Sequence, residues 1–227
     1  MPSLTQLLTS HHHLLVLDAA STITQVGLLQ ASAPALWHSV PEEAGTAVFT
    51  GTEAVLKRAG IPFADLGAFV FCAGPGSMLG TRTVAMALRT WQVLSPRRVY
   101  FYQSLAIAAH HEWTQKPGRS FNVIADARRG TWHCQGVAAG SGPAGLQRLP
   151  AAELPAGELV TPENFRAWAP LPRPAAVCSY DLANIFPALG EGDFFQATSA
   201  PDAFQHQAPE YKKWSAQVHS SATAPAK

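Results

Sequence analysis

The chain has 227 residues, and 47% of them are hydrophobic, which excludes a disordered protein and is enough for a sizeable core. Only 14% of residues are charged and the formal net charge is +1, which excludes a strong global field that draws the protein to nucleic acid or a membrane surface. Three widely spaced cysteines and the lack of a membrane-length apolar run lead us to expect a cytoplasmic protein without disulfides.

The first elements predict an antiparallel hairpin. Residues 1–13, which include a run of three histidines, are expected to form a flexible extension. The apolar run 14–17 predicts a central strand that ends at Asp18, and residues 24–29 predict the return strand. Asp18 either caps the turn or faces a ligand at the strand end, and capping is the commoner use of such a residue.

Helices and strands alternate after this hairpin. The sequence predicts a third strand at 36–40, helices at 43–59 and 77–94, strands at 68–72 and 98–102, and a helix at 104–111. Gly60 is positioned to end the first helix, and Ser77 is positioned to cap the second. This order predicts one lobe of an α/β protein with a mixed sheet, which we place at residues 14–104.

The second half of the chain repeats the opening pattern. Residues 121–125 predict a strand that ends at Asp126, followed by a turn and a return strand at 131–137. This recurrence indicates an internal duplication, and we place the second, less regular lobe at residues 105–215. Three further elements are expected: a short helix near 162–168, a strand at 175–178 and a helix at 181–189. Residues 216–227 are expected to be a flexible end.

A glycine-rich loop lies between the strand at 68–72 and the helix at 77–94. It carries Gly74, Gly76 and Gly80 around Ser77, at a helix N-terminus that suits an anion. No lysine lies nearby, so a P-loop is excluded, and the third glycine misses the dinucleotide-binding spacing by one position. The residues two before and two after Ser77 are not glycine, which argues against a hydrolase nucleophile. A tight turn with a capped helix and no ligand remains the alternative.

The histidines do not have the spacing of a metal site. His110 and His111 are adjacent, so their side chains point about 100° apart on a helix and cannot clamp one ion. His111 and Glu112 resemble the start of an H-E-x-x-H pattern, but Gln115 occupies its last position. We therefore expect no metal ligand and no catalytic residue of the zinc peptidase type.

Four motifs resemble those of one bacterial family. They are the runs Leu15-Val16-Leu17-Asp18-Ala19-Ala20, Gly74-Pro75-Gly76-Ser77-Met78-Leu79-Gly80-Thr81-Arg82, Ala125-Asp126-Ala127-Arg128-Arg129-Gly130 and Pro209-Glu210-Tyr211-Lys212-Lys213. Together they resemble the TsaB (YeaZ) family of glycoprotease-like proteins. The resemblance implies an actin/hexokinase/Hsp70-like (ASKHA, ribonuclease H-like) α/β fold with two lobes and mixed sheets.

The same resemblance implies a role without catalysis of its own. Proteins of this family bind a catalytic subunit, TsaD, and act with an ATPase, TsaE, to place a threonylcarbamoyl group on the adenosine beside the anticodon of certain tRNAs. They contact tRNA only through the complex, do not bind membranes, and form homodimers when alone. Two helices, 43–59 and 77–94, would supply the partner and dimer interface through these residues: Val48, Thr52, Val55, Thr81, Val84, Ala85 and Leu88.

Several departures from the family pattern bear on nucleotide chemistry. Ala19-Ala20 stands where a glycine is usual, and Cys178-Ser179-Tyr180 stands at the second-lobe turn that lets adenosine approach the backbone. ATP hydrolysis is therefore not expected. The candidate nucleotide-binding residues, for ATP or ADP with Mg²⁺, are Asp18, Gly74, Gly76, Ser77 and Asp126. The alternative is a stand-alone nucleotide-dependent transferase or small-molecule kinase with Asp18 and Asp126 as its carboxylates, and a peptidase ranks last.

Overall fold

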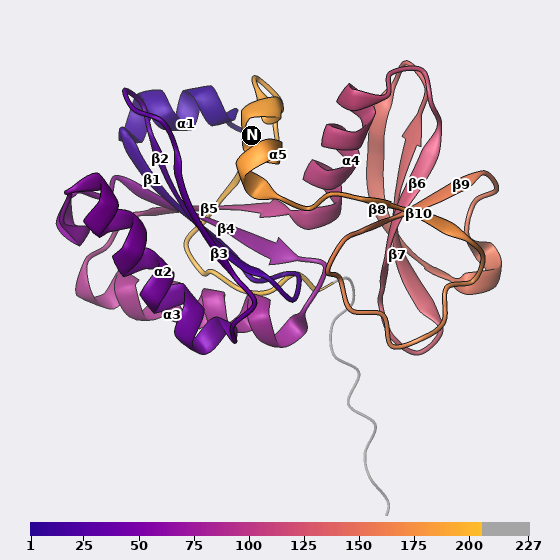
Figure 1. The fold of residues 1–227 in the computed structure, drawn as a ribbon, viewed down its shortest axis with the longest axis horizontal. Coiled ribbons are helices and arrows are strands. Elements are labelled where there is room, and N and C mark those ends of the chain that lie inside the picture. Colours follow the sequence, from indigo (N-terminus) through magenta and orange to yellow (C-terminus); the bar gives the residue numbers. More distant parts are fainter. Residues whose placement is uncertain (206–227) are drawn as a thin grey trace, which may run out of the picture.

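The structure is a computed structural model that describes residues 1–205 of the chain. Its framework is a pair of mixed β-sheets that lie side by side, with helix α4 (Ser104–Gln115) between them (Figure 1). We call the part built on the first sheet the first lobe and the part built on the second sheet the second lobe. Residues 206–227, which include the predicted motif at 209–213 and the predicted flexible end, lie outside the described part.

The first sheet has six strands. Their spatial order is β11 (Gln196–Thr198), β5 (Arg98–Gln103), β4 (Ala68–Gly74), β1 (His13–Asp18), β2 (Thr24–Gln30) and β3 (Leu36–Val40). Strands β1, β2 and β3 form an antiparallel meander, and β4 and β5 are added parallel to β1. The apolar run of β1 is buried on both faces of the sheet, as its unbroken sequence of Leu and Val predicts.

The second sheet repeats this arrangement. Its order is β10 (Ala175–Cys178), β9 (Glu158–Pro162), β6 (Phe121–Asp126), β7 (Thr131–Ala138) and β8 (Gly142–Pro150). Strands β6, β7 and β8 form the meander, and β9 and β10 are added parallel to β6. The two lobes thus share one topology, in agreement with the duplication that the two strand–Asp–turn–strand patterns indicated.

Helices cover both faces of the first sheet. Helices α2 (Ala44–Ala59) and α3 (Met78–Leu94) pack on one face, close to the predicted bounds. Helices α1 (Leu4–His11), α4 and α5 (Leu182–Leu189) pack on the other face (Figure 1). Side chains of α4 join those of the second sheet in the same apolar cluster, so one continuous core links the two lobes.

The prediction that residues 1–13 are a flexible extension is wrong. The Ser3 hydroxyl caps helix α1 by accepting a hydrogen bond from the backbone N–H of Gln6, and the Ser3 backbone N–H in turn donates to the side-chain oxygen of Gln6. Leu4 and Leu7 are buried against the first sheet, which gives the helix a reason to form despite its short length.

The second half of the chain also differs from expectation. Three strands were missed, β8, β9 and β11, and the helix expected near 162–168 is an irregular segment. Two short 3₁₀ turns, η1 (Phe63–Asp65) and η2 (Ala151–Glu153), complete the described elements.

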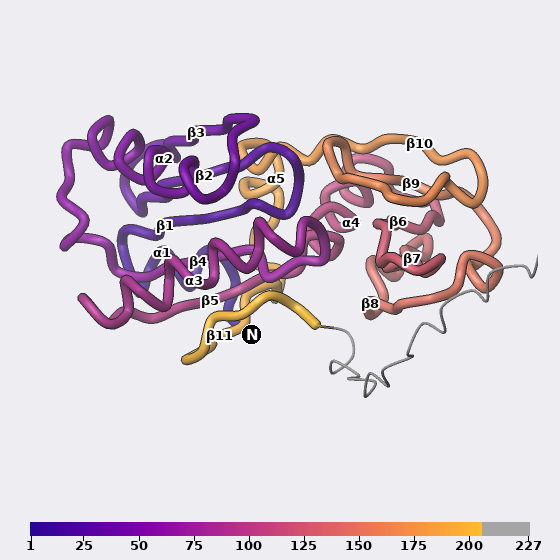
Figure 2. The backbone as a smooth tube through the Cα atoms, turned by 90° about the horizontal axis from the view of Figure 1, so that it is seen from below, coloured from indigo at the N-terminus to yellow at the C-terminus, as the bar shows by residue number. Residues whose placement is uncertain are grey.

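The division at residues 104 and 105 needs correction. The chain returns to the first lobe after β10: Phe186 of α5 packs against Trp37 of β3, with ring centroids 5.4 Å apart, and β11 pairs with β5 (Figure 2). The first lobe is therefore built from two separate stretches of chain, and the range 105–215 is not one lobe.

Candidate functional site

Asp18, the residue at the end of β1, is sealed inside the protein. Its side chain is 0% exposed, and one carboxylate oxygen accepts a hydrogen bond of 2.8 Å from the backbone of Ala20. The other oxygen accepts bonds of 2.7 Å from the hydroxyls of Tyr102, at the end of β5, and Tyr180, just after β10. We call these three side chains the Asp18 cluster. It ties the end of β1 to the end of β5, two strands away in the first sheet, and to the segment that follows β10 of the second sheet.

Burial sets the protonation behaviour of the Asp18 cluster. Loss of water raises the pKa of Asp18, and the bonds from Tyr102, Ala20 and Tyr180 offset only part of that rise. Burial, followed by the nearby Asp18 charge, raises the pKa of both tyrosines well above the usual value. The tyrosines therefore stay protonated and donate to Asp18, whose side chain has no exposed surface.

The glycines of the loop before α3 allow close contact between this loop and the turn that follows β1. A Cβ atom on Gly76 would lie 2.4 Å from the carbonyl oxygen of Ala20, and one on Gly80 would lie 2.1 Å from that of Ala19. The backbone of Ser77 donates to the Ala20 carbonyl at 2.6 Å. The glycines are thus needed because the turn after β1 rests directly on the start of α3.

The remaining loop residues also have structural partners. The Ser77 hydroxyl caps α3 by accepting a bond of 3.2 Å from the backbone of Gly80. Gly74 has a φ of 116°, a conformation that favours glycine, and the next residue's carbonyl accepts a bond from the hydroxyl of Ser104. Of the expected nucleotide-binding residues, Gly76, Ser77 and Asp126 do line a pocket between the lobes, whereas Asp18 and Gly74 do not.

Asp126, the counterpart of Asp18 in the second lobe, is held by backbone amides. One carboxylate oxygen accepts from Arg128 at 2.5 Å, and the other accepts from Trp168 and Ala169 at 2.6 and 2.9 Å. These bonds fix the segment between β9 and β10 onto the turn between β6 and β7. Both aspartates at strand ends therefore organise the fold, which is the capping alternative of the sequence analysis.

The residues expected to form a partner interface on α2 and α3 are instead core residues. All seven are at most 5% exposed: Val48, Thr52, Val55, Thr81, Val84, Ala85 and Leu88. Four of them, Val48, Val55, Val84 and Leu88, belong to the apolar cluster on the first sheet. The periodic apolar stripe that suggested an interface is the stripe that packs on the chain's own sheet. The residue set available to a partner is therefore corrected to the outward side chains of the same helices.

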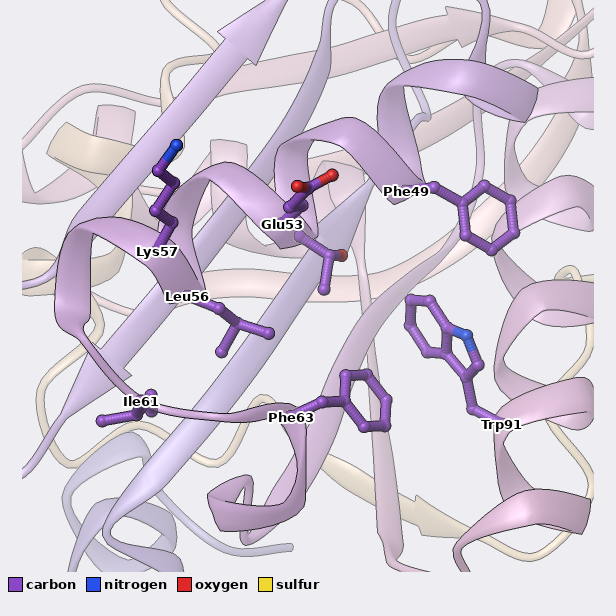
Figure 3. Close-up of a pocket in the computed structure, with 8 residues that line it drawn as sticks. Phe49, Glu53, Leu56, Lys57, Ile61, Phe63 and Trp91 are labelled. Atoms are coloured by element: carbon purple, nitrogen blue, oxygen red, sulfur yellow. The ribbon is translucent and has the colours of Figure 1, made fainter.

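The outward side of α2 and α3 also carries apolar side chains. Phe49 on α2 is 50% exposed, and Met86 on α3 is 55% exposed. Phe49 meets Trp91 edge-on at a centroid distance of 5.8 Å, and Phe63 lies on the other side of Trp91 at 5.2 Å (Figure 3). These rings and the α2 side chains Glu53 and Lys57 line a groove of about 530 Å³. We call this groove and Met86 the α2–α3 face.

Among residues 1–205, no group of three or more His, Cys, Asp and Glu side chains is arranged to hold a metal ion. None of the helices in the described residues combines the length and apolar character that a membrane crossing requires.

Two tyrosines of the Asp18 cluster were missed as functional residues. Tyr180 meets Asp18 across 162 positions of sequence, so no local pattern indicates the contact. One signal was available: Tyr180 stands where the resemblance places a glycine-rich turn. Its buried ring packs edge-on against Phe165 at a centroid distance of 4.9 Å.

Comparisons with known proteins bear on the fold. A solved structure of YeaZ from Pseudomonas aeruginosa superposes with a TM-score of 0.60 and 20% identity, covering 78% of this chain and 89% of that one. The structure of an uncharacterized protein with similarity to peptidase YeaZ, from the same organism, superposes equally well with 22% identity and the same coverage. The chain has the YeaZ fold.

This likeness confirms the predicted fold class, an α/β ASKHA-type fold with two mixed sheets. No family model matches the sequence, and no curated protein matches it. The identities to the two YeaZ structures lie below the level at which a shared fold carries a shared function, so function is argued from the site.

Proposed function

We propose that this chain is a non-catalytic partner subunit of the machinery that makes threonylcarbamoyladenosine beside the anticodon of tRNA, and that it binds a TsaD-like catalytic subunit in the cytoplasm. In this proposal a TsaE-like ATPase acts on the same complex, and tRNA is contacted through the assembly. The motifs in the first lobe and the YeaZ fold support the assignment.

The state of Asp18 is the observation that carries the proposal. A nucleotide-dependent enzyme of this fold would need a free carboxylate, and Asp18 at the end of the first strand is one of the two candidates for it. Here that carboxylate is 0% exposed and bonded to two tyrosine hydroxyls, one from each lobe. Asp18 therefore provides no free carboxylate for a reaction at this position. This supports the proposal that the chain organises a catalytic partner and does not catalyse the reaction itself.

The α2–α3 face is the proposed contact with the catalytic subunit. It combines exposed Phe49 and Met86 with the half-buried ring of Trp91, and aromatic and Met side chains are enriched in the cores of protein interfaces. Helices α2 and α3 lie side by side, so a partner helix pair packs on them as a four-helix contact. In the absence of the partner, two copies use the same face to form a homodimer.

Light scattering after size-exclusion chromatography tests the proposal. The chain and the TsaD-like protein of the same organism, mixed at about 10 µM each, are expected to elute as one species with their summed mass. Phe49→Asp places a charge in the apolar groove and is expected to separate the two proteins. Val177→Asp is the control, because Val177 is an equally apolar, 69% exposed side chain in the second lobe.

Two results would overturn the proposal. One is separate elution of the wild-type proteins. The other is a complex that survives Phe49→Asp as well as it survives Val177→Asp, which would place the contact elsewhere.

The alternative function, a stand-alone nucleotide-dependent transferase or kinase, needs a carboxylate that can reach substrate or Mg²⁺. Asp126 lines the pocket between the lobes, but three backbone amides already occupy its oxygens. Calorimetry with ATP and Mg²⁺ separates the two ideas, because the alternative requires binding accompanied by turnover and the partner subunit does not.

A further inference from the structure

The chain crosses from the second lobe back to the first at residues 179–181, between β10 and α5 (Figure 1). We call these three residues the crossing segment. A connection between two lobes is where a hinge has to bend, because its backbone takes up the change in angle. The contacts of the crossing segment therefore decide whether the lobes can move relative to each other.

Gln25 of β2 fastens the crossing segment to the first lobe. Gln25 is the direct partner of Asp18 in the pairing of β1 with β2, so both side chains leave the sheet on the same face. Gln25 is 2% exposed, and its side-chain nitrogen donates to the carbonyl of Tyr180 at 2.8 Å. Its side-chain oxygen accepts from the backbone of Leu182 at 2.9 Å. One buried side chain thus satisfies two backbone groups around the crossing point.

The second lobe holds the same segment from the other side. One carboxylate oxygen of Glu163, in the turn after β9, accepts from the Ser179 hydroxyl at 2.8 Å and from the Tyr180 backbone at 3.0 Å. The edge-on contact between the rings of Phe165 and Tyr180 lies beside these bonds. The crossing segment is therefore bonded to both lobes, and a bend there would break bonds on one side or the other.

A turn of each lobe also meets the other directly. The backbone of Thr22, between β1 and β2, donates to the carbonyl of Asn164 at 2.8 Å. Asn164 has a φ of 63°, a left-handed conformation that asparagine adopts more readily than most residues. Asn164 follows Glu163, so one turn of the second lobe contacts both the crossing segment and the first lobe. We call the bonds of Gln25, the bonds of Glu163, the Thr22–Asn164 bond and the Asp18 cluster together the lobe lock.

Helix α4 stiffens the other connection between the lobes. It leads from β5 of the first sheet to β6 of the second, and it contacts strands of both sheets. Its buried side chains belong to the apolar cluster that is shared by the two lobes. Because protein interiors are close-packed, a rotation of one lobe against the other would open this cluster as well as break the lobe lock.

We propose that the lobe lock holds the two lobes in one fixed orientation, so that the chain does not open and close around a ligand. In hinged proteins a ligand supplies the contacts that close the lobes. Here the chain's own side chains supply such contacts, and separating the lobes would leave buried groups of Gln25, Tyr180 and Leu182 without partners.

The lobe lock has a consequence for the surfaces of the protein. The α2–α3 face and the second lobe are presented in the same relative orientation whether or not a small molecule enters between the lobes. The inference rests on the contacts between the lobes and does not depend on the partner-subunit proposal.

Double electron–electron resonance spectroscopy tests the proposal by measuring the distance between the lobes. Spin labels are attached to Thr50→Cys on α2 and Gln147→Cys on β8, which are exposed positions in different lobes. The three native cysteines are buried, so the introduced cysteines react first. One narrow distribution of distances is expected, and it is expected to stay unchanged when ATP and Mg²⁺ are added at millimolar concentration.

Gln25→Ala and Gln25→Met test the lobe lock itself. Methionine keeps most of the side-chain volume but cannot bond the backbone of Tyr180 and Leu182, so both variants are expected to broaden the distribution of distances. The amide of Thr22, which Gln25 does not bond, is expected to exchange its hydrogen about tenfold faster in nuclear magnetic resonance measurements, because the lobes separate more often.

Gln135→Ala is the matched control. Gln135 is 3% exposed, and its side chain also bonds backbone, but to Ala144 within the second lobe. This variant is expected to keep the wild-type distribution of distances and the wild-type exchange rate at Thr22. Circular dichroism confirms that each variant is folded.

Three results would overturn the proposal. The first is a wild-type protein with two distances between the lobes, or with one distance that shifts when ATP and Mg²⁺ are added. The second is a wild-type distribution in the Gln25 variants. The third is a distribution that broadens as much in Gln135→Ala as in Gln25→Ala. All of these measurements use the chain alone, so their outcome is separate from co-elution with the TsaD-like protein.

Discussion

Gly80 in helix α3 offers the sharpest test of why the glycine loop has its sequence. If the glycines exist to let the turn after β1 rest on α3, Gly80→Ala destabilises the fold in the absence of any ligand. The added Cβ would lie 2.1 Å from the carbonyl oxygen of Ala19 and 3.1 Å from the Ala19 Cβ. The turn and the helix would have to separate by about an ångström, because ordinary carbon–oxygen contacts begin above 3 Å.

The magnitude follows from two opposed terms. Overpacking a tight site costs about 1–3 kcal/mol, and a backbone carbonyl cannot rotate away as a side chain can, so the upper end applies. Alanine in place of glycine within a helix returns about 1 kcal/mol. The net loss is therefore about 2 kcal/mol, which lowers the Tm of a domain of this size by roughly 4–8 °C.

Gly45 in helix α2 is the matched control. It is exposed, and a Cβ built there meets nothing within 4 Å. Gly45→Ala is expected to stabilise the protein by up to about 1 kcal/mol, so the same substitution in two helices has opposite signs.

Urea unfolding followed by circular dichroism measures both variants against the wild type. The reasoning is refuted if Gly80→Ala is as stable as Gly45→Ala, since the turn and α3 would then not be in close contact. It is refuted equally if the loss for Gly80→Ala appears only in the presence of a nucleotide, which would assign the glycine to a ligand.

Three further predictions concern the buried polar groups. The raised pKa of Asp18 contributes stability at low pH, and this contribution is lost as pH rises from the ordinary value of 3.8 through the raised pKa. The free energy of unfolding of the wild type, measured by urea titration relative to Asp18→Asn, should therefore fall over that pH interval. A rise would contradict the argument that burial raises this pKa. Tyr180→Phe removes a hydrogen bond to a buried carboxylate and should lower the free energy of unfolding by about 2 kcal/mol. Tyr100→Phe is the control and should lower it by well under about 1 kcal/mol, because the Tyr100 hydroxyl bonds the half-buried His11. Equal losses of stability in the two variants would refute this prediction. Ser3→Ala should cost about 1 kcal/mol by removing the α1 cap, and no change in Tm would mean that the α1 cap contributes nothing.

Local patterns in the sequence predicted much of the fold. The unbroken apolar run before Asp18, the glycine loop and the helical periodicity of α3 each depend on neighbours within a few positions, and each formed where expected. Helix α1 was missed although its signals were present, because Ser3 and Gln6 have the spacing of a capping box. Strands β8 and β9 were missed because residues 138–175 are rich in Pro, Ala and Gly, which are poor strand formers. Strand β8 nevertheless forms a hairpin with β7, and β9 pairs with β6 and β10.

The site was harder to predict because it depends on long-range contacts. The chemistry of Asp18 depends on Tyr180, and the sequence near either residue does not indicate the other. On α3 both sides carry apolar residues, so periodicity found the stripe around Val84 and Leu88 but could not tell a buried stripe from a docking surface. The structure shows that the first sheet covers the side of α3 with Val84 and Leu88, which leaves the side with Met86 exposed.

A reconstituted tRNA reaction tests the central claim most directly. The amount of threonylcarbamoyladenosine formed on substrate tRNA is measured with the TsaD-like subunit alone, with this chain alone, and with both, in the presence of the remaining components. The account predicts product with both proteins, loss of product with Phe49→Asp, and none with either alone. Modification by this chain without the TsaD-like subunit, or full activity of that subunit without this chain, would contradict it.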